Sequence, residues 1–102
     1  MDEKSFALRL AQLREKKKVS AREMSLSIGQ NASYINSIES GKMLPSLSGF
    51  FYICEYLGIT ESEFFDWENK DPSKLNAVLQ DMKKLSEGQL DNVAALIKEL
   101  IK

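Results

Sequence analysis

Apolar residues recur along this chain at the spacing of an amphipathic helix, and no segment alternates between apolar and polar residues as a strand does. Phe6, Leu10 and Leu13 stand at positions i, i+4 and i+7 of a first predicted helix, which should fade in the lysine run before Val19. The pattern predicts an all-α protein.

Capping residues divide the first two thirds of the chain into five short helices. Ser20 followed by Glu23 has the pattern of a capping box, in which each side chain accepts a hydrogen bond from the other residue's backbone N–H. Thr60 and Glu63 repeat this pattern before a short fifth helix, which we expect to carry Phe64, Phe65 and Trp67. Asn31 is expected to cap the third helix and Ser46 the fourth. The predicted helix ends are glycines, which adopt the left-handed conformation readily: Gly29, Gly41 and Gly58.

A polar linker, residues 68–72, separates these helices from a helical hairpin predicted over residues 72–102. Asp71 and Pro72 are a favourable pair for the cap and first position of a helix, and Ser86 with Gln89 restarts the chain after a turn. Each hairpin helix carries an apolar stripe that needs a covering surface. The stripe residues are Leu75, Val78, Leu79, Met82 and Leu85 on one helix, and Leu90, Val93, Ala94, Ile97, Leu100 and Ile101 on the other.

Composition excludes several classes of protein. The 102 residues, 43% of them hydrophobic, allow one domain with an appendage. With no histidine and one cysteine the chain assembles neither a zinc finger nor a disulfide framework. We expect no metal, no cofactor and no catalytic site, because no nucleophile–base arrangement stands out. Cys54 falls on the apolar face of the fourth helix, which indicates a buried core thiol rather than a redox sensor.

No apolar run approaches the length of a membrane span, and the first ten residues lack the layout of a signal peptide. We therefore expect a cytoplasmic protein that does not enter a membrane. The sequence indicates no binding site for a small molecule.

The net charge of −1 hides a gradient along the chain. Residues 1–59 hold eight lysines and arginines against six acidic residues, whereas residues 60–102 hold six against nine. A nucleic-acid partner normally requires a basic footprint. The N-terminal part is therefore the better candidate for such contact, although its lysine run also suits the solvated end of a helix.

The segment VSAREMSLSIGQNASYINSIESG, followed by GKMLPSL, resembles the helix-turn-helix regulators of the Cro/C1 type, also called the XRE family. The resemblance runs from Leu10 to Phe65. It implies a five-helix, lambda-repressor-like DNA-binding domain over residues 1–68, with the second helix of the motif lying in the major groove of double-stranded DNA. The hairpin over residues 72–102 would then be a dimerisation or packing element.

The resemblance also assigns roles to individual residues of a recognition helix at residues 32–40. Asn36 is chemically the most capable of them, because its amide pairs bidentately with adenine. The residues expected to face base edges are Ala32, Ser33, Asn36 and Ser37, and those expected to approach phosphates are Arg22, Tyr34, Ser40 and Lys42. Alternatively, these are solvated polar residues, and Tyr34 packs its ring on a neighbouring helix.

Three positions depart from the family pattern. Ala21 stands where a phosphate-holding glutamine is common, and Ala32 and Ser37 stand where arginine or lysine is common. Because no guanidinium is placed to read guanine, any specificity should favour A·T pairs or DNA shape.

The resemblance further implies that Arg14 and Glu39 form a partly buried ion pair between the first helix and the recognition helix. Removing one partner of such a pair strands a charge. On this expectation, Arg14→Ala destabilises the domain more than Arg9→Ala does.

Two alternatives stay open at this point. The chain is either a DNA-binding transcription regulator or a protein-interaction module that kept the fold and lost its DNA affinity. The hairpin and an aromatic strip of Phe51, Tyr52 and Tyr56 either make a homodimer or pack against each other within a monomer.

Overall fold

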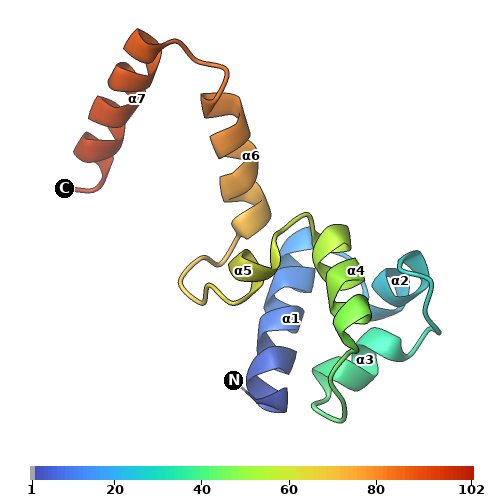
Figure 1. Ribbon diagram of the computed structural model, residues 1–102. Helices are drawn as coiled ribbons and strands as arrows, with labels where there is room; N and C mark the ends of the chain where they lie inside the picture. The colour runs from blue at the N-terminus through green and yellow to red at the C-terminus, as the bar shows by residue number, and fades with distance from the viewer. Residues whose placement is uncertain (1) are drawn as a thin grey trace.

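The computed structural model describes residues 2–102 and contains seven α-helices and no strand within that range (Figure 1). The all-α prediction is confirmed. In chain order the helices are α1 (Glu3–Lys17), α2 (Ala21–Ser27), α3 (Tyr34–Glu39), α4 (Leu47–Leu57), α5 (Glu61–Phe64), α6 (Pro72–Met82) and α7 (Glu87–Leu100).

The first five helices enclose a single core. The predicted stripe of α1 is fully or nearly fully buried, and it meets residues of α2, α3, α4 and α5. An aromatic cluster closes one end, where the ring centroids of Phe6 and Phe64 lie 4.8 Å apart and those of Phe50 and Phe64 lie 5.1 Å apart in an edge-to-face arrangement. The remaining members of the core are Leu10, Leu13, Met24, Ile35, Ile38, Ile53, Cys54, Leu57 and Ile59.

Most predicted helix boundaries are confirmed. Ser46 accepts a hydrogen bond from the backbone N–H of Gly49 at the start of α4, and Pro72 occupies the first turn of α6 behind the Asp71 cap. Both halves of the capping box are present at the start of α5 and of α7. The helix-ending glycines at 29, 41 and 58 have φ between 71° and 78°, in the left-handed region.

Three local predictions are wrong in part. Ser20 accepts from the Glu23 backbone N–H at 2.9 Å, but the reciprocal half of that capping box is absent from the described residues. Asn31 does not stand at the cap of α3: its side chain holds a turn by accepting from Ser33, and α3 begins only at Tyr34. Helix α5 ends at Phe64, so Phe65 and Trp67 lie beyond it.

Arg9 occupies the centre of a cage of backbone carbonyls at the C-terminal end of α5. Its side chain is 1% exposed. Nε donates to the Phe64 carbonyl at 2.6 Å, Nη1 donates to the Gln12 side chain at 2.6 Å, and Nη2 donates to three further carbonyls at 2.8–2.9 Å. Those three carbonyls belong to Glu63, Asp66 and Asn69.

The cage joins the first helix to a segment more than fifty residues away. The Glu63 and Asp66 carbonyls also accept backbone N–H groups, from Asp66 and Asn69 respectively. The buried cation adds a donor to these two and supplies hydrogen bonds to the Phe64 and Asn69 carbonyls beside them. Burial lowers the pKa of the Arg9 guanidinium, and the nearby Asp66 carboxylate acts in the opposite direction. Arg9 is more buried and makes more hydrogen bonds than Arg14, so the structure favours the opposite order from the one expected from the sequence, with Arg9→Ala the more destabilising substitution.

Arg14 and Glu39 join α1 to α3. Arg14 donates to both carboxylate oxygens of Glu39, at 2.7 and 2.9 Å, and to the Val19 carbonyl at 2.8 Å. The two charged side chains are 17% and 12% exposed. Hydrogen bonding to Glu39 raises the pKa of Arg14, so the charged, paired form is the stable one.

Helices α6 and α7 project away from the five-helix unit as an arm, which we define as residues 72–102 (Figure 1). Pro72 is the one buried residue of α6, and α7 has none. The radius of gyration is 16.5 Å, compared with about 13 Å for a compact domain of this length. In this structure the arm does not fold back onto α4, and its two helices diverge from the turn that joins them.

No helix among residues 2–102 is long and apolar enough to cross a lipid bilayer.

The cage predicts an order of stability among three arginine variants. Arg9→Ala leaves four carbonyls without their shared donor and should lower the free energy of unfolding by about 3–5 kcal/mol. Arg14→Ala should cost less, because its pair is partly solvated, and Arg22→Ala, at an exposed position, should change stability by no more than about 0.5 kcal/mol. Urea denaturation monitored by circular dichroism measures all three. An Arg9→Ala variant as stable as Arg22→Ala would contradict the structural role of the cage.

The burial of Cys54 predicts an unreactive thiol. Cys54 is 1% exposed, and burial, assisted by the negative charge of Glu61, raises its pKa to about 12. A thiol-specific reagent at pH 8 should modify Cys54 slowly in the folded protein and fast in urea, because the thiolate is the reacting species. The unfolded thiol has a pKa of about 8.5. The contribution of the neutral Cys54 thiol to the free energy of unfolding is therefore complete below that pH, and it should decline as the pH rises towards 12. Equal modification rates in folded and unfolded protein would contradict this assignment.

Candidate nucleic-acid interface

Helices α2 and α3 pack against each other through a buried serine in the first of them. The Ser25 hydroxyl donates to the Ala21 carbonyl at 2.7 Å and accepts from the backbone N–H of Ile35 at 2.9 Å. An N–H in the first turn of α3 is thus satisfied by α2, and Ser33, the cap residue of α3, makes no capping hydrogen bond with its side chain. This bond fixes the start of α3 relative to α2.

The residues predicted to face base edges lie along one edge of this helix pair. Ala32 and Ser33 belong to the turn before α3, whereas Asn36 and Ser37 lie within the helix. Asn36 and Ser33 are exposed, and the other two are half-buried. The recognition helix is therefore shorter than the predicted residues 32–40.

A shallow depression, here called the α2–α3 hollow, is lined by Ala21, Arg22, Ala32, Ser33 and Asn36. It brings together one predicted phosphate-contacting residue and three predicted base-reading residues. Ser37 is not part of its lining.

The polar groups of the hollow differ in how far they are already engaged. The Ser33 hydroxyl donates to the Asn31 side chain at 2.8 Å. Within residues 2–102 the Arg22 guanidinium and the Asn36 amide make no side-chain hydrogen bond, so both present donors to solvent. The hollow therefore offers an amide and a cation to a ligand.

The charge of the α2–α3 hollow distinguishes it from four other depressions on the surface of residues 2–102. Its lining contains a guanidinium and no carboxylate. Each of the other four includes one carboxylate: Glu55, Asp2, Glu39 or Glu15. Because DNA carries a negative charge on every phosphate, a lining with a guanidinium and no carboxylate suits contact with it. Among the other four depressions, only the one lined by Glu15, Lys16 and Lys18 also has a net positive charge.

The structure separates the four residues predicted to approach phosphates. Arg22 and Lys42 are exposed. The Ser40 hydroxyl donates to the Ser37 carbonyl at 2.9 Å, at the end of α3. Tyr34 is half-buried against the core, and burial raises its pKa.

The Tyr34 hydroxyl lies directly beside the first turn of α4. A Cβ added to Gly49 would come within 2.5 Å of the hydroxyl oxygen. Glycine at this position therefore leaves room for the Tyr34 hydroxyl against the first turn of α4. The tyrosine joins the two helices as well as bordering the candidate surface.

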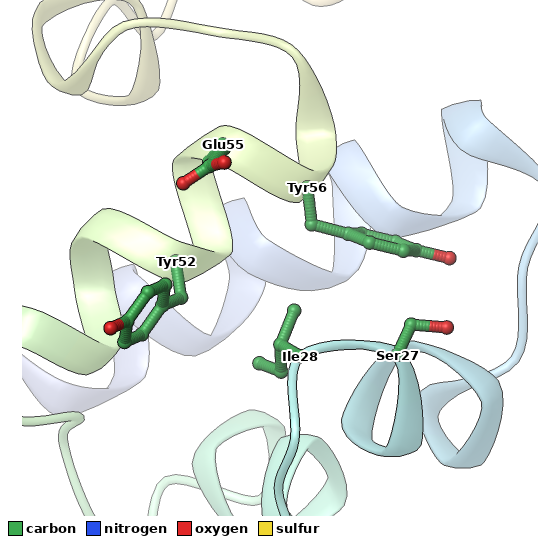
Figure 2. A pocket seen from close by; sticks show the side chains of 5 residues that line it. All are labelled: Ser27, Ile28, Tyr52, Glu55 and Tyr56. Carbon is green, nitrogen blue, oxygen red and sulfur yellow. The ribbon is translucent and has the colours of Figure 1, made fainter.

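The lysine run at the end of α1 turns in part towards α4. Lys17 Nζ lies 4.9 Å from the ring centroid of Tyr56, within the range of a cation–π interaction. Tyr56 in turn borders a groove between α4 and the end of α2, together with Tyr52, Glu55, Ser27 and Ile28 (Figure 2). Among exposed cations, Arg22 and Lys42 are the nearest in sequence to the recognition helix, one before it and one after it.

Sequence reasoning missed the roles of three residues: Ser25 and Gly49, which position this surface, and Arg9, which joins α1 to the end of α5. A signal was available for Arg9, which stands three residues after Phe6 and beside Leu10, within the apolar stripe of α1. For Ser25 and Gly49 the signal was weak, because a serine and a glycine in short helices are ordinary residues whose partners lie on other helices.

Comparison with known proteins bears directly on this arrangement. No curated protein and no solved structure matches the chain. The sequence model of one family, described as a helix-turn-helix domain, matches residues 8–70. The matched range includes α2, α3 and the entire carbonyl cage from Arg9 to Asn69. It covers more than half of the chain, and the protein therefore belongs to the helix-turn-helix domain family.

Proposed function

We propose that this protein is a sequence-specific transcription regulator of the Cro/repressor type, or XRE family, and that α3 reads double-stranded DNA from the major groove. The observation that carries the proposal is the α2–α3 hollow, where an unengaged amide and an unengaged guanidinium meet on a surface without a carboxylate. The helix-turn-helix family supplies the docking geometry, in which the second helix of the motif enters the groove.

In this proposal Asn36 is the principal base-reading residue, with Ala32, Ser33 and Ser37 beside it. Arg22 and Lys42 contact phosphates, and Tyr34 and Ser40 lie at the border of the contact surface. Two exposed cations give a weak electrostatic contribution for one protomer, because affinity for DNA rises with the number of neutralised phosphates. Doubling the contact surface compensates for this weakness.

We further propose that the protein acts as a homodimer and that the arm, residues 72–102, joins the two copies. The support is the unpartnered apolar surface of α6 and α7. Leu75, Val78 and Leu79 on α6 are 46–57% exposed, and Leu96 and Leu100 on α7 are 59% and 73% exposed. Patches of this kind on a soluble chain mark interaction sites.

The proposed role is binding without catalysis, in the cytoplasm. In this proposal residues 1–68 form the DNA-binding unit, and the arm forms the dimer contact. Two-fold symmetry would place two α3 helices about 34 Å apart on one face of the DNA, so the operator should be an imperfect palindrome.

Two substitutions separate base reading from phosphate contact. Asn36→Ala should weaken binding to the preferred sequence by about 1–3 kcal/mol and leave random DNA almost unaffected, because a base contact is lost. Lys42→Ala should weaken binding to all sequences and reduce the salt slope by about one unit, because a phosphate contact carries no sequence information. Fluorescence polarisation over a range of salt concentrations measures both effects.

The matched controls lie on the arm. Asn92→Ala and Lys74→Ala should change neither the DNA affinity of a protomer nor its salt slope. If neither Asn36→Ala nor Lys42→Ala alters any DNA affinity, or if the unaltered protein binds no DNA at low salt, the DNA-reading proposal is wrong. A protein-interaction module on the same fold would then take its place.

The arm is tested by placing a charge in its apolar stripe. Ile97→Asp should convert a dimer at micromolar concentration into a monomer, because a carboxylate in an apolar interface is costly to desolvate. Asn92→Asp, on the same helix outside the stripe, adds the same charge and should leave the dimer intact. Sedimentation velocity measures the mass of each, and a monomeric unaltered protein would exclude the homodimer.

A further inference from the structure

We infer that the α2–α3 hollow is a receptor for the C5-methyl group of thymine, so that the protein reads an A·T pair through two features at once. This inference rests on the proposed DNA-binding function and deepens it by naming the ligand group of the hollow. Three observations lead to it: the chemistry of the lining, the engagement of its polar groups, and the position of Asn36.

The lining contributes two methyl groups to the candidate DNA surface. Ala21 at the start of α2 and Ala32 in the turn before α3 are both half-buried and border the same depression. Longer side chains at these two positions would fill the depression. Alanine leaves space beside an apolar wall, which suits a small apolar group.

The hydroxyl that borders the hollow is already occupied. Ser33 directs its hydroxyl to the Asn31 side chain and receives no partner from the hollow itself. The Ser33 hydroxyl therefore does not present a free donor beside the two alanine methyl groups. The open donors are the Asn36 amide at one border and the Arg22 guanidinium at another.

A single A·T pair presents the complement of this arrangement. In the major groove adenine offers N7 and N6, which an asparagine amide contacts bidentately, and its thymine partner offers the C5-methyl group. A G·C pair offers neither the adenine pattern nor the methyl group. The hollow beside Asn36 thus matches an A·T pair, or two adjacent ones, while Arg22 is free for the phosphate.

The four other depressions compared above fit this ligand less well. None of them combines two alanine methyl groups with an asparagine amide in its lining. The proposed methyl receptor is continuous with the surface that α2 and α3 present, so it requires no second contact region on the protein.

The test removes the methyl group from the DNA rather than from the protein. A preferred duplex is selected from random sequences at low salt, and each thymine is then replaced singly by deoxyuridine, which lacks only the C5-methyl group. Removing a methyl group from an apolar contact should weaken binding about fourfold. We expect such a loss at one or two thymines per half-site and none at the others.

Protein variants then locate the effect in the hollow. In Ala32→Val the added methyl groups fill the depression, so thymine and deoxyuridine duplexes should bind equally. Ala32→Gly, which removes the wall without adding volume, should also reduce the difference. Ala77→Val, at an exposed position of α6, is the matched control and should keep the fourfold difference; thermal unfolding checks that each variant folds.

The outcomes distinguish this inference from the proposed function. Sequence-specific binding with no sensitivity to deoxyuridine at any position overturns the methyl receptor and leaves the DNA-binding proposal standing. A deoxyuridine effect that persists unchanged in both Ala32 variants also overturns it, because the methyl group is then read elsewhere. Failure to bind any duplex overturns the proposed function and this inference together.

Discussion

The buried guanidinium of Arg9 holds together the two ends of the five-helix unit. One side chain on α1 supplies donors to four backbone carbonyls, and these lie at the end of α5 and in the segment leading to α6. Two of them, Glu63 and Asp66, also accept a backbone N–H, whereas Phe64 and Asn69 depend on the guanidinium for the hydrogen bond that replaces water. The aromatic cluster around Phe64 packs directly beside the cage, so the polar and apolar parts of this end of the core depend on each other.

The same cage determines where the five-helix unit ends and the arm begins. Asn69 supplies the last carbonyl, Asp71 caps α6, and Pro72 is buried. Beyond this point the chain has no buried residue in α7 and leaves the apolar faces of both arm helices exposed. The unit that folds around Arg9 and the exposed apolar surface that we propose binds a second copy are therefore different parts of the chain.

The candidate DNA surface is held by short polar contacts, one of which is an ion pair. Ser25 sets the start of α3 against α2, Arg14 and Glu39 attach α3 to α1, and Gly49 admits α4 close to Tyr34. These contacts leave Asn36 and Arg22 unengaged at a hollow with an apolar wall. In the proposed DNA-binding role, a surface of this chemistry would discriminate among bases by shape and methyl contact more than by long-range attraction, in keeping with the low net charge of the chain.

The sequence by itself determined the helices, most of their caps and the order of the motif, because hydrophobic periodicity and capping act between residues three to seven positions apart. It also indicated Asn36 and Arg22 as candidates, because their positions match those of the helix-turn-helix motif that the sequence resembles. Only the tertiary structure decided that α3 starts at Tyr34, because its first turn is satisfied by Ser25 on another helix. The burial of Arg9 was likewise decided there, since its partners lie more than fifty residues away and are backbone carbonyls, which no side-chain pattern records.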